Sequence, residues 1–129
     1  MYELTVREHF DAAHALRGYP GQCRDLHGHT WDVEVSVAGT ELDDIGILYD
    51  FKKLKDDLRT ILDAYDHAYL NEVKPFDEMN STAENLARVI YERLDARLPE
   101  QVHLTEVCVW ESPVARLRFR RVMQRDHRS

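Results

Sequence analysis

Two stretches of alternating apolar and polar residues constrain the fold more than any other feature of this chain. In the run from residue 27 to residue 39, one parity carries His27, His29, Trp31, Val33, Val35 and Val37. The run from residue 2 to residue 14 has the same period and ends in His14, although Glu8 and His9 interrupt it and predict a bulge or an edge. Successive strand side chains point to opposite faces, so each run predicts a strand with one buried face. Antiparallel pairing would bring His14 beside His27 and His29.

The segment after the second strand predicts an amphipathic helix. Residues 47–49 first predict a short strand. Asp50 is then placed as a helix N-cap, and apolar residues recur at helical spacing over 51–65. The charged residues between them, among them Asp57 and Arg59, are expected on the solvent face.

A second helix and two more strands follow. Residues 81–84 have the sequence of a capping box, in which Ser81 is the N-cap and the last residue reaches back, and Pro99 ends the helix. Residues 102–111 and 117–122 predict two strands. The complete order predicts an α+β domain: a four-stranded antiparallel sheet with two helices packed on one face.

Length and composition are those of an ordinary globular protein. The 129 residues are 43% hydrophobic and 32% charged, which predicts a single domain over 1–121 followed by a C-terminal tail, 122–129. No apolar run reaches the roughly 18–20 residues of a membrane-spanning helix. The first residues show no leader pattern, and two cysteines make a poor disulfide framework, so the cytoplasm is the expected compartment.

The net charge of −7 argues against non-specific nucleic-acid binding, which depends on phosphate neutralisation by Lys and Arg. Arginines nevertheless gather near the end of the chain: Arg116, Arg118, Arg120, Arg121, Arg125 and Arg128. A solvated last strand and tail explains them most simply. The alternative is a basic rim for a small anionic substrate.

Three histidines form the first candidate site. His14, His27 and His29 with an open fourth position are typical of a catalytic zinc site, whereas structural zinc sites have four protein ligands. Cys23 lies four residues before His27. Spacing alone allows two roles for this thiol: a base or nucleophile activated by nearby cations, or the fourth ligand of a closed zinc site.

Further residues could take part in the chemistry. In the dipeptide Asp66–His67 the carboxylate could orient the imidazole for proton transfer, although such a dipeptide alone is more often a helix-terminal turn. Glu111, at the end of an apolar strand, could hold a planar guanidine-like edge through two hydrogen bonds, or be an ordinary surface acid. Cys108 is expected to pack in the core.

Taken together, these residues resemble a known family. The motifs occur in order as Phe10–His14, Cys23, His27–His29, Asp50–Phe51, Asp66–His67, Asn80–Glu84 and Trp110–Glu111. Over residues 2–121 they resemble the 6-pyruvoyl-tetrahydropterin synthase family. The resemblance implies the tunnelling fold, in which the sheets of several subunits join into a β-barrel.

The resemblance implies a Zn²⁺ site on His14, His27 and His29, and it makes Cys23 the catalytic thiol rather than a fourth ligand. Three residues separate Cys23 from His27, as in the carboxy branch of the family; the pyruvoyl branch has five, and a further branch has glutamate in place of the cysteine. The implied reaction converts 7,8-dihydroneopterin triphosphate to 6-carboxy-5,6,7,8-tetrahydropterin, acetaldehyde and triphosphate, in queuosine or 7-deazapurine biosynthesis.

The resemblance also implies a relay of Asp66 and His67, with Glu111 anchoring the pterin ring. It implies a homo-hexamer of two trimers, with the sites at subunit interfaces. No motif assigns the triphosphate-binding residues, for which the arginines of 116–121 are the candidates. Two alternatives are a 6-pyruvoyl-tetrahydropterin synthase and a non-catalytic zinc-binding protein whose site Cys23 closes.

Overall fold

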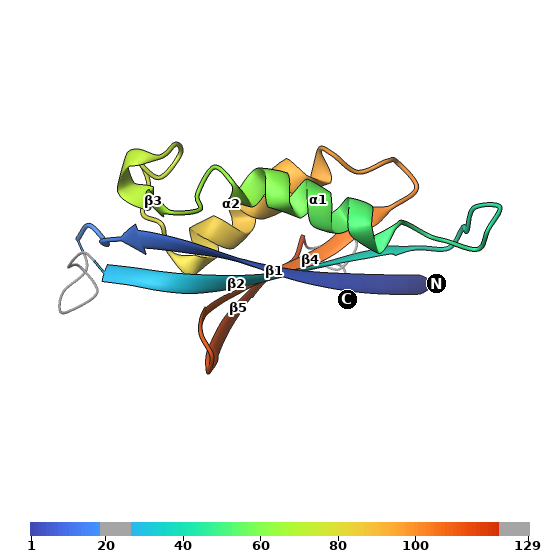
Figure 1. Cartoon of the computed structure of the whole chain (residues 1–129), viewed down its shortest axis with the longest axis horizontal. Helices are drawn as coiled ribbons and strands as arrows, with labels where there is room; N and C mark the ends of the chain where they lie inside the picture. The colour runs from blue at the N-terminus through green and yellow to red at the C-terminus, as the bar shows by residue number, and fades with distance from the viewer. Residues whose placement is uncertain (19–26, 122–129) are drawn as a thin grey trace, which may run out of the picture.

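The computed structural model describes residues 1–18 and 27–121, so Cys23 and the predicted tail 122–129 lie outside the described residues. The elements are β1 (Tyr2–His14), β2 (His27–Gly39), α1 (Phe51–Leu62), β3 (Ala68–Tyr69), the 3₁₀ helix η2 (Leu70–Glu72), α2 (Ala83–Asp95), β4 (His103–Ser112) and β5 (Ala115–Phe119). One sheet has the order β3-β1-β2-β4-β5, and both helices cover the same face of it (Figure 1). The predicted α+β class, with four antiparallel strands and two helices on one face, is confirmed; the fifth strand, β3, pairs parallel to β1.

Strands β1 and β2 pair antiparallel over their full length, with His14 opposite His27. The predicted pairing is confirmed. Of the two predictions for Glu8 and His9, the bulge is wrong, because the register runs without a shift, and the edge is confirmed among the described residues, because β3 pairs with β1 only at Ala12 and Ala13. The Glu8 side chain lies on the same face of β1 as the apolar residues, and its carboxylate faces two cations of α1. Its oxygens lie 3.4 Å from Lys55 Nζ and 3.2 Å from Arg59 Nη1. Ion pairs with the helix therefore accommodate this acid on the helix-covered face.

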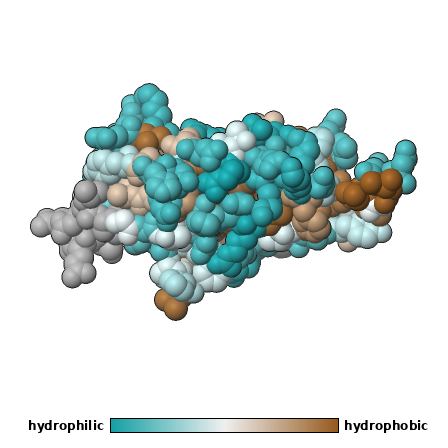
Figure 2. Space-filling view, in the orientation of Figure 1, coloured by the Kyte–Doolittle hydropathy of each residue, from teal (hydrophilic) through white to brown (hydrophobic). Residues whose placement is uncertain are grey.

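The hydrophobic core lies between the sheet and the two helices. Its fully buried residues include members of β2 (Trp31, Val33, Val35, Val37), α1 (Leu54, Leu58, Leu62), α2 (Leu86, Ile90, Leu94) and β4 (Val107, Val109). The period of two along the strand and the helical spacing of both helices thus meet in one core. Figure 2 shows a largely hydrophilic surface over the helices, with an apolar patch at the end where the loop from β2 to α1 lies. Among the described residues, no helix is long and apolar enough to cross a membrane.

Helix α1 begins as predicted but differs on its outer side. The Asp50 side chain accepts an N–H of the first turn, which confirms it as the N-cap. Asp57, expected on the solvent face, is 4% exposed. The Tyr49 hydroxyl donates to Asp57 at 2.7 Å, and cations of Lys53 and Arg97 lie 3.8 and 3.4 Å from the same carboxylate. Burial, and then the contact with Asp57, raise the pKa of Tyr49, so this hydroxyl stays a donor.

Two strand predictions need correction. Residues 47–49 form no strand: the Asp43 side chain accepts the N–H groups of Ile45 and Ile47 and folds this segment into a loop. Strand β5 lies slightly earlier than the predicted 117–122. Strand β3, which the sequence did not indicate, has only two residues, too few for an alternating pattern to be visible.

Helix α2 begins one residue later than the capping box predicts. Thr82, rather than Ser81, is the N-cap, and its hydroxyl accepts the N–H of Asn85 at 3.1 Å. Ser81 is 1% exposed and its hydroxyl lies 3.0 Å from His14 Nδ1. The prediction of Ser81 as the N-cap was wrong because its hydroxyl lies against His14, a residue distant in sequence, and the neighbouring Thr82 hydroxyl caps the helix instead. The helix also ends before Pro99 is reached.

Cys108 is buried as predicted, but on the face of the sheet away from the helices. A register shift between β2 and β4 changes the parity along β4, so that Leu104 and Val107 both belong to the core while Cys108 does not. The thiol donates to Glu106 at 3.1 Å. Burial raises the pKa of the Cys108 thiol, which makes it a structural rather than a reactive group.

Two asparagine side chains fix the chain directly after β1. The Asn71 amide accepts the N–H of Ala15 at 3.1 Å and donates to the carbonyl of the same residue at 2.8 Å. Asn80 makes the same pair of bonds with Arg17, each at 2.9 Å. Each amide thus satisfies both backbone groups of one residue, as a neighbouring strand would.

The cap of α2 gives a first prediction. Replacing Thr82 by Ala should lower the free energy of unfolding by about 1 kcal/mol, because an N–H in the first turn loses its acceptor. Urea unfolding followed by circular dichroism measures the change. Glu84→Ala is the matched control, since among the described residues the Glu84 side chain makes no hydrogen bond back to the helix start, and it should cost less than half as much. A larger effect for Glu84→Ala would restore the capping-box interpretation.

Candidate functional site

Two histidines and a glutamate gather at one end of the sheet, on the face that carries the helices. His14 ends β1, His29 lies near the start of β2, and Glu111 lies near the end of β4. A Glu111 oxygen is 3.5 Å from His29 Nε2 and 3.8 Å from His14 Nε2. The imidazole rings stand edge to face, with centroids 5.3 Å apart. The sheet register therefore brings together three groups that are far apart in sequence.

His14 is held in one orientation by its surroundings. It is 1% exposed, and its Nδ1 lies 3.0 Å from both the carbonyl and the hydroxyl oxygen of Ser81. Because a carbonyl oxygen can only accept, Nδ1 is assigned as the donor, which leaves the lone pair of the neutral ring on Nε2. The Trp31 ring packs edge to face against His14 and His29, with centroids 5.1 and 5.2 Å away. Such support is typical of a metal-binding histidine.

The donor atoms of this cluster fit a transition-metal ion. One ligand atom from each of His14, His29 and Glu111 lies within 4.8 Å of the other two. Imidazole nitrogen with carboxylate oxygen is a donor set that suits zinc. The backbone of His27 pairs with that of His14, but the side chain of this predicted third ligand lies outside the described part of the chain. Glu111, predicted to bind the substrate, lies directly against the two imidazoles.

Asp66 and His67 form a second cluster, at the outer edge of β1. The His67 N–H donates to the carbonyl of Asp11 at 2.5 Å, and Asp66 Oδ1 accepts the N–H of Asp11 at 3.0 Å. The same oxygen is 3.0 Å from His67 Nδ1. His67 has a φ of 58°, in the left-handed region that costs a non-glycine residue energy, and its ring is 78% exposed. The predicted pairing of carboxylate and imidazole is thus present in the geometry.

The Asp66 carboxylate is stabilised in its ionised form. The backbone N–H of Asp11 lowers its pKa most, desolvation acts in the opposite direction, and the charges of His67 and Arg59 lower the pKa further. The ionised Asp66 lies 3.0 Å from Nδ1 of His67, so Nε2 of this exposed ring is the nitrogen that faces away from the carboxylate.

The cluster of His14, His29 and Glu111 is called the metal-type cluster below. This cluster and the Asp66–His67 relay lie on different sides of β1. His14 and His29 belong to the helix-covered face, whereas Asp11 and Thr30 have the opposite parity. Thr30 donates to Asp11 at 2.6 Å, and an open hollow of about 620 Å³ lies beside Asp11, Thr30 and His67. Sequence reasoning assigned no role to Asp11 and Thr30, although their position next to two histidines on paired strands was a usable signal.

The lowered pKa of Asp66 predicts a pH dependence of stability. A carboxyl whose folded-state pKa is depressed stabilises the fold above its unfolded pKa of about 3.9, and this contribution is lost as the pH falls through the folded-state value. Asp66→Asn should therefore unfold more easily than the unmodified protein at pH 6, and the difference should shrink toward pH 3. Urea unfolding at a series of pH values measures it. A difference that stays constant down to pH 3 would contradict the assignment.

Comparison with known proteins agrees with both the motifs and the fold. Residues 3–122 match the family described as 6-pyruvoyl tetrahydropterin synthase. A 6-carboxy-5,6,7,8-tetrahydropterin synthase of Haemophilus influenzae is 33% identical, over 89% of this chain and 96% of that protein. A dihydroneopterin monophosphate aldolase of Pyrococcus furiosus is 39% identical, over 84% and 88%. The structure of Caenorhabditis elegans 6-pyruvoyl tetrahydropterin synthase superposes with a TM-score of 0.82 at 28% identity, over 94% and 96% of the two chains, which confirms the tunnelling fold.

These matches span both histidine-bearing strands, the relay and the strand that ends at Glu111. The chain belongs to the 6-pyruvoyl tetrahydropterin synthase family and is a pterin lyase.

Proposed function

We propose that this protein converts 7,8-dihydroneopterin triphosphate to 6-carboxy-5,6,7,8-tetrahydropterin, with release of acetaldehyde and triphosphate. The observation that carries the proposal is the gathering of His14, His29 and Glu111 at one end of the sheet, within 4.8 Å of one another. The relative from Haemophilus influenzae and the three-residue interval between Cys23 and His27 support the carboxy product. The proposed setting is queuosine or 7-deazapurine biosynthesis in the cytoplasm.

Zn²⁺ is the metal we propose, with His14, His27 and His29 as its ligands. The fit rests on His14, whose Nδ1 is occupied by Ser81 so that Nε2 faces the other donors. Zinc bound there would supply a Lewis acid for the oxygen atoms of the substrate side chain. Glu111 would grip the guanidine-like edge of the pterin ring through two hydrogen bonds and orient the side chain for reaction.

Proton transfer is the task we assign to Cys23, Asp66 and His67. The Cys23 thiolate would remove a proton from a side-chain carbon. His67 would donate or accept on the other face of the substrate, using Nε2, because Nδ1 lies against Asp66. Triphosphate then leaves by elimination, and the remaining side chain is cleaved between two carbons.

We propose a homo-hexamer of two trimers with shared active sites. Within one chain, the metal-type cluster and the relay lie on different sides of β1, so a site between subunits could combine a relay from one chain with the histidines of another. Within the described part of the chain, the sheet also ends in two strands with one unpaired edge each, β3 and β5. Such edges favour pairing with further strands, and sheets joined in this way would form the barrel of the fold. Exposed Leu42, Ile45 and Ile47 offer additional apolar contact surface.

A second candidate is an aldolase that acts on the monophosphate. The observation in its favour is the 39% identity with the protein of that description from Pyrococcus furiosus. The three-residue interval between Cys23 and His27, which is that of the carboxy branch, favours the carboxy product over this candidate. A pyruvoyl product, or a closed zinc site without activity, are the remaining alternatives.

Product analysis tests the proposed reaction. Zinc-loaded protein is incubated without oxygen with 7,8-dihydroneopterin triphosphate and, separately, with the monophosphate, and the products are identified by mass. We expect carboxytetrahydropterin and acetaldehyde from the triphosphate. A pyruvoyl product, or turnover of the monophosphate alone, would replace the proposed reaction. No turnover of either substrate would overturn the proposal that this protein catalyses the reaction.

Two variants separate the thiol from the metal ligands. Cys23→Ala should lose activity by at least about 10²-fold while its zinc content stays near one equivalent, because a base is removed and no ligand is lost. His27→Ala should lose zinc and activity together. Metal analysis of purified, dialysed protein gives the zinc content. Loss of zinc from Cys23→Ala would show the thiol to be a ligand and favour the closed site.

A further inference from the structure

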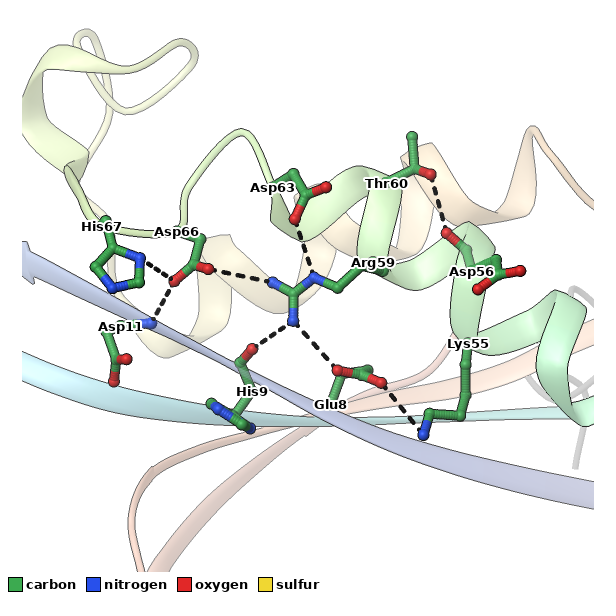
Figure 3. A network of polar contacts seen from close by, with 10 residues as sticks. All are labelled: Glu8, His9, Asp11, Lys55, Asp56, Arg59, Thr60, Asp63, Asp66 and His67. Carbon is green, nitrogen blue, oxygen red and sulfur yellow. Dashed lines mark hydrogen bonds and ion pairs between the residues drawn. The ribbon is translucent and has the colours of Figure 1, made fainter.

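Arg59, on α1, is the centre of a network that reaches the relay (Figure 3). Its Nη1 donates to the carbonyl of His9 at 2.8 Å and to Glu8 Oε1 at 3.2 Å. Its Nε donates to Asp63 Oδ1 at 3.0 Å. Its Nη2 lies 3.7 Å from Asp66 Oδ2. By helical spacing this residue belongs to the solvent face, yet its side chain is only 31% exposed and bridges to β1.

The contacts fix the plane of the guanidinium. A guanidinium is a rigid planar fork, so bonds at Nε and Nη1 also determine where Nη2 points. Nη2 is buried and has no hydrogen-bond partner among the described residues, and it faces the Asp66 carboxylate. The fork is therefore anchored on one side by the strand and the helix, and its remaining nitrogen is directed at the relay.

The two oxygens of Asp66 have different partners. Oδ1 accepts the N–H of Asp11 and lies against His67 Nδ1, whereas Oδ2 faces Arg59. A carboxylate rotates about its last bond with little resistance, so partners on both oxygens are needed to keep one oxygen directed at the imidazole. Arg59 supplies the partner on the second oxygen.

We propose that Arg59 is a positioning residue for the Asp66–His67 pair: it holds the carboxylate in the rotation in which Oδ1 accepts the Nδ1 proton and His67 Nε2 is left to move protons. The inference rests on the proposed function, because it assigns Arg59 a part in the proton transfer of that reaction. It makes α1 part of the active site although no residue of the helix belongs to either cluster.

The surrounding charges agree with this role. Arg59 is one of the charges that lower the pKa of Asp66, after the backbone N–H of Asp11 and together with His67 and His9. The other charged groups that face this region are Glu8 and Asp11 on β1 and Lys55 and Asp63 on α1. An Asp11 carboxylate oxygen lies within 4.8 Å of both Asp66 and His67, and all three substitutions leave it in place. Glu8, Asp63 and Asp66 each lie against the Arg59 guanidinium. This cation offsets the repulsion among the three carboxylates.

The competing explanation is that Arg59 only ties α1 to β1. Lys55 offers a matched control, because it lies one turn earlier on α1 and pairs with the same Glu8, at 3.4 Å, without contacting Asp66. Arg59→Ala, Arg59→Lys and Lys55→Ala should be compared, with circular dichroism to confirm folding. If Arg59→Ala does not fold, Arg59→Gln takes its place, since it keeps length and a donor while removing the charge.

The first measurement is the titration of the Asp66 carboxyl, by carbon NMR of metal-free protein labelled at aspartate. We expect Arg59→Ala to raise the pKa of Asp66, Arg59→Lys to bring it back toward the unmodified value, and Lys55→Ala to leave it in place. The second is kcat, which should fall by about 10-fold in Arg59→Ala with KM within about twofold, recover in part in Arg59→Lys, and stay within about twofold in Lys55→Ala.

An unchanged titration in Arg59→Ala, or equal losses of kcat in Arg59→Ala and Lys55→Ala, would overturn the positioning role and leave Arg59 as a tether. The titration needs neither metal nor substrate, so it judges the contact independently of turnover. A protein that is inactive before any substitution would overturn the proposed function, whereas a raised Asp66 pKa in Arg59→Ala would still support the contact.

Discussion

The antiparallel register between β1 and β2 is the constraint on which the rest of this structure depends. It sets His14 opposite His27 and Ala12 opposite His29, so the histidines of two separate runs share one end of one face. A slip of one residue would transfer every side chain of a strand to the other face and disperse the cluster. The buried valines of β2 prevent such a slip, because it would bring them out of the core. The same apolar contacts that stabilise the fold thereby align the candidate metal ligands.

The elements could be predicted from the sequence because they follow periodic patterns. A period of two gave both long strands with their observed bounds, and the helical spacing gave α1 and α2. What the sequence could not reveal is which polar side chain meets which. Glu8 interrupts an apolar run and therefore predicted a bulge or an edge. Its partner Arg59 lies 51 residues away, so the sequence pattern around Glu8 could not indicate the ion pair. Ser81 was predicted as a helix cap from its local sequence. Its actual partner, His14, is 67 residues away and could not be identified from that local sequence.

In the candidate site, too, the positions set by strand pairing could be predicted from the sequence, whereas the contacts between polar groups could not. His14 and His29 were placed together from strand pairing alone, and the structure adds Glu111 to them, with a carboxylate oxygen 3.5 Å from His29 Nε2 and 3.8 Å from His14 Nε2. The relay could be named from its dipeptide, but its hydrogen bonds to the backbone N–H and carbonyl of Asp11 could not, because backbone groups have no signature in the sequence. Helix α1 likewise has two functions that its pattern does not separate. Its apolar stripe packs on the sheet, while Asp57 and Arg59 on its polar side are bound in networks.

The amides of Asn71 and Asn80 have a consequence for how this enzyme family can vary. They fasten Ala15 and Arg17 to the segment after β3, while the strand register fastens His27 to β1. The span between these two anchors is set by the scaffold and is independent of the number of residues that bridge it. A change in the number of residues between these anchors should therefore leave His14 and His27 paired, because the entropy of closing a chain segment grows slowly with its length, by roughly 0.6 kcal/mol per doubling. The pairing of His14 with His27 is thereby set by the scaffold on both sides of this segment and not by the segment itself.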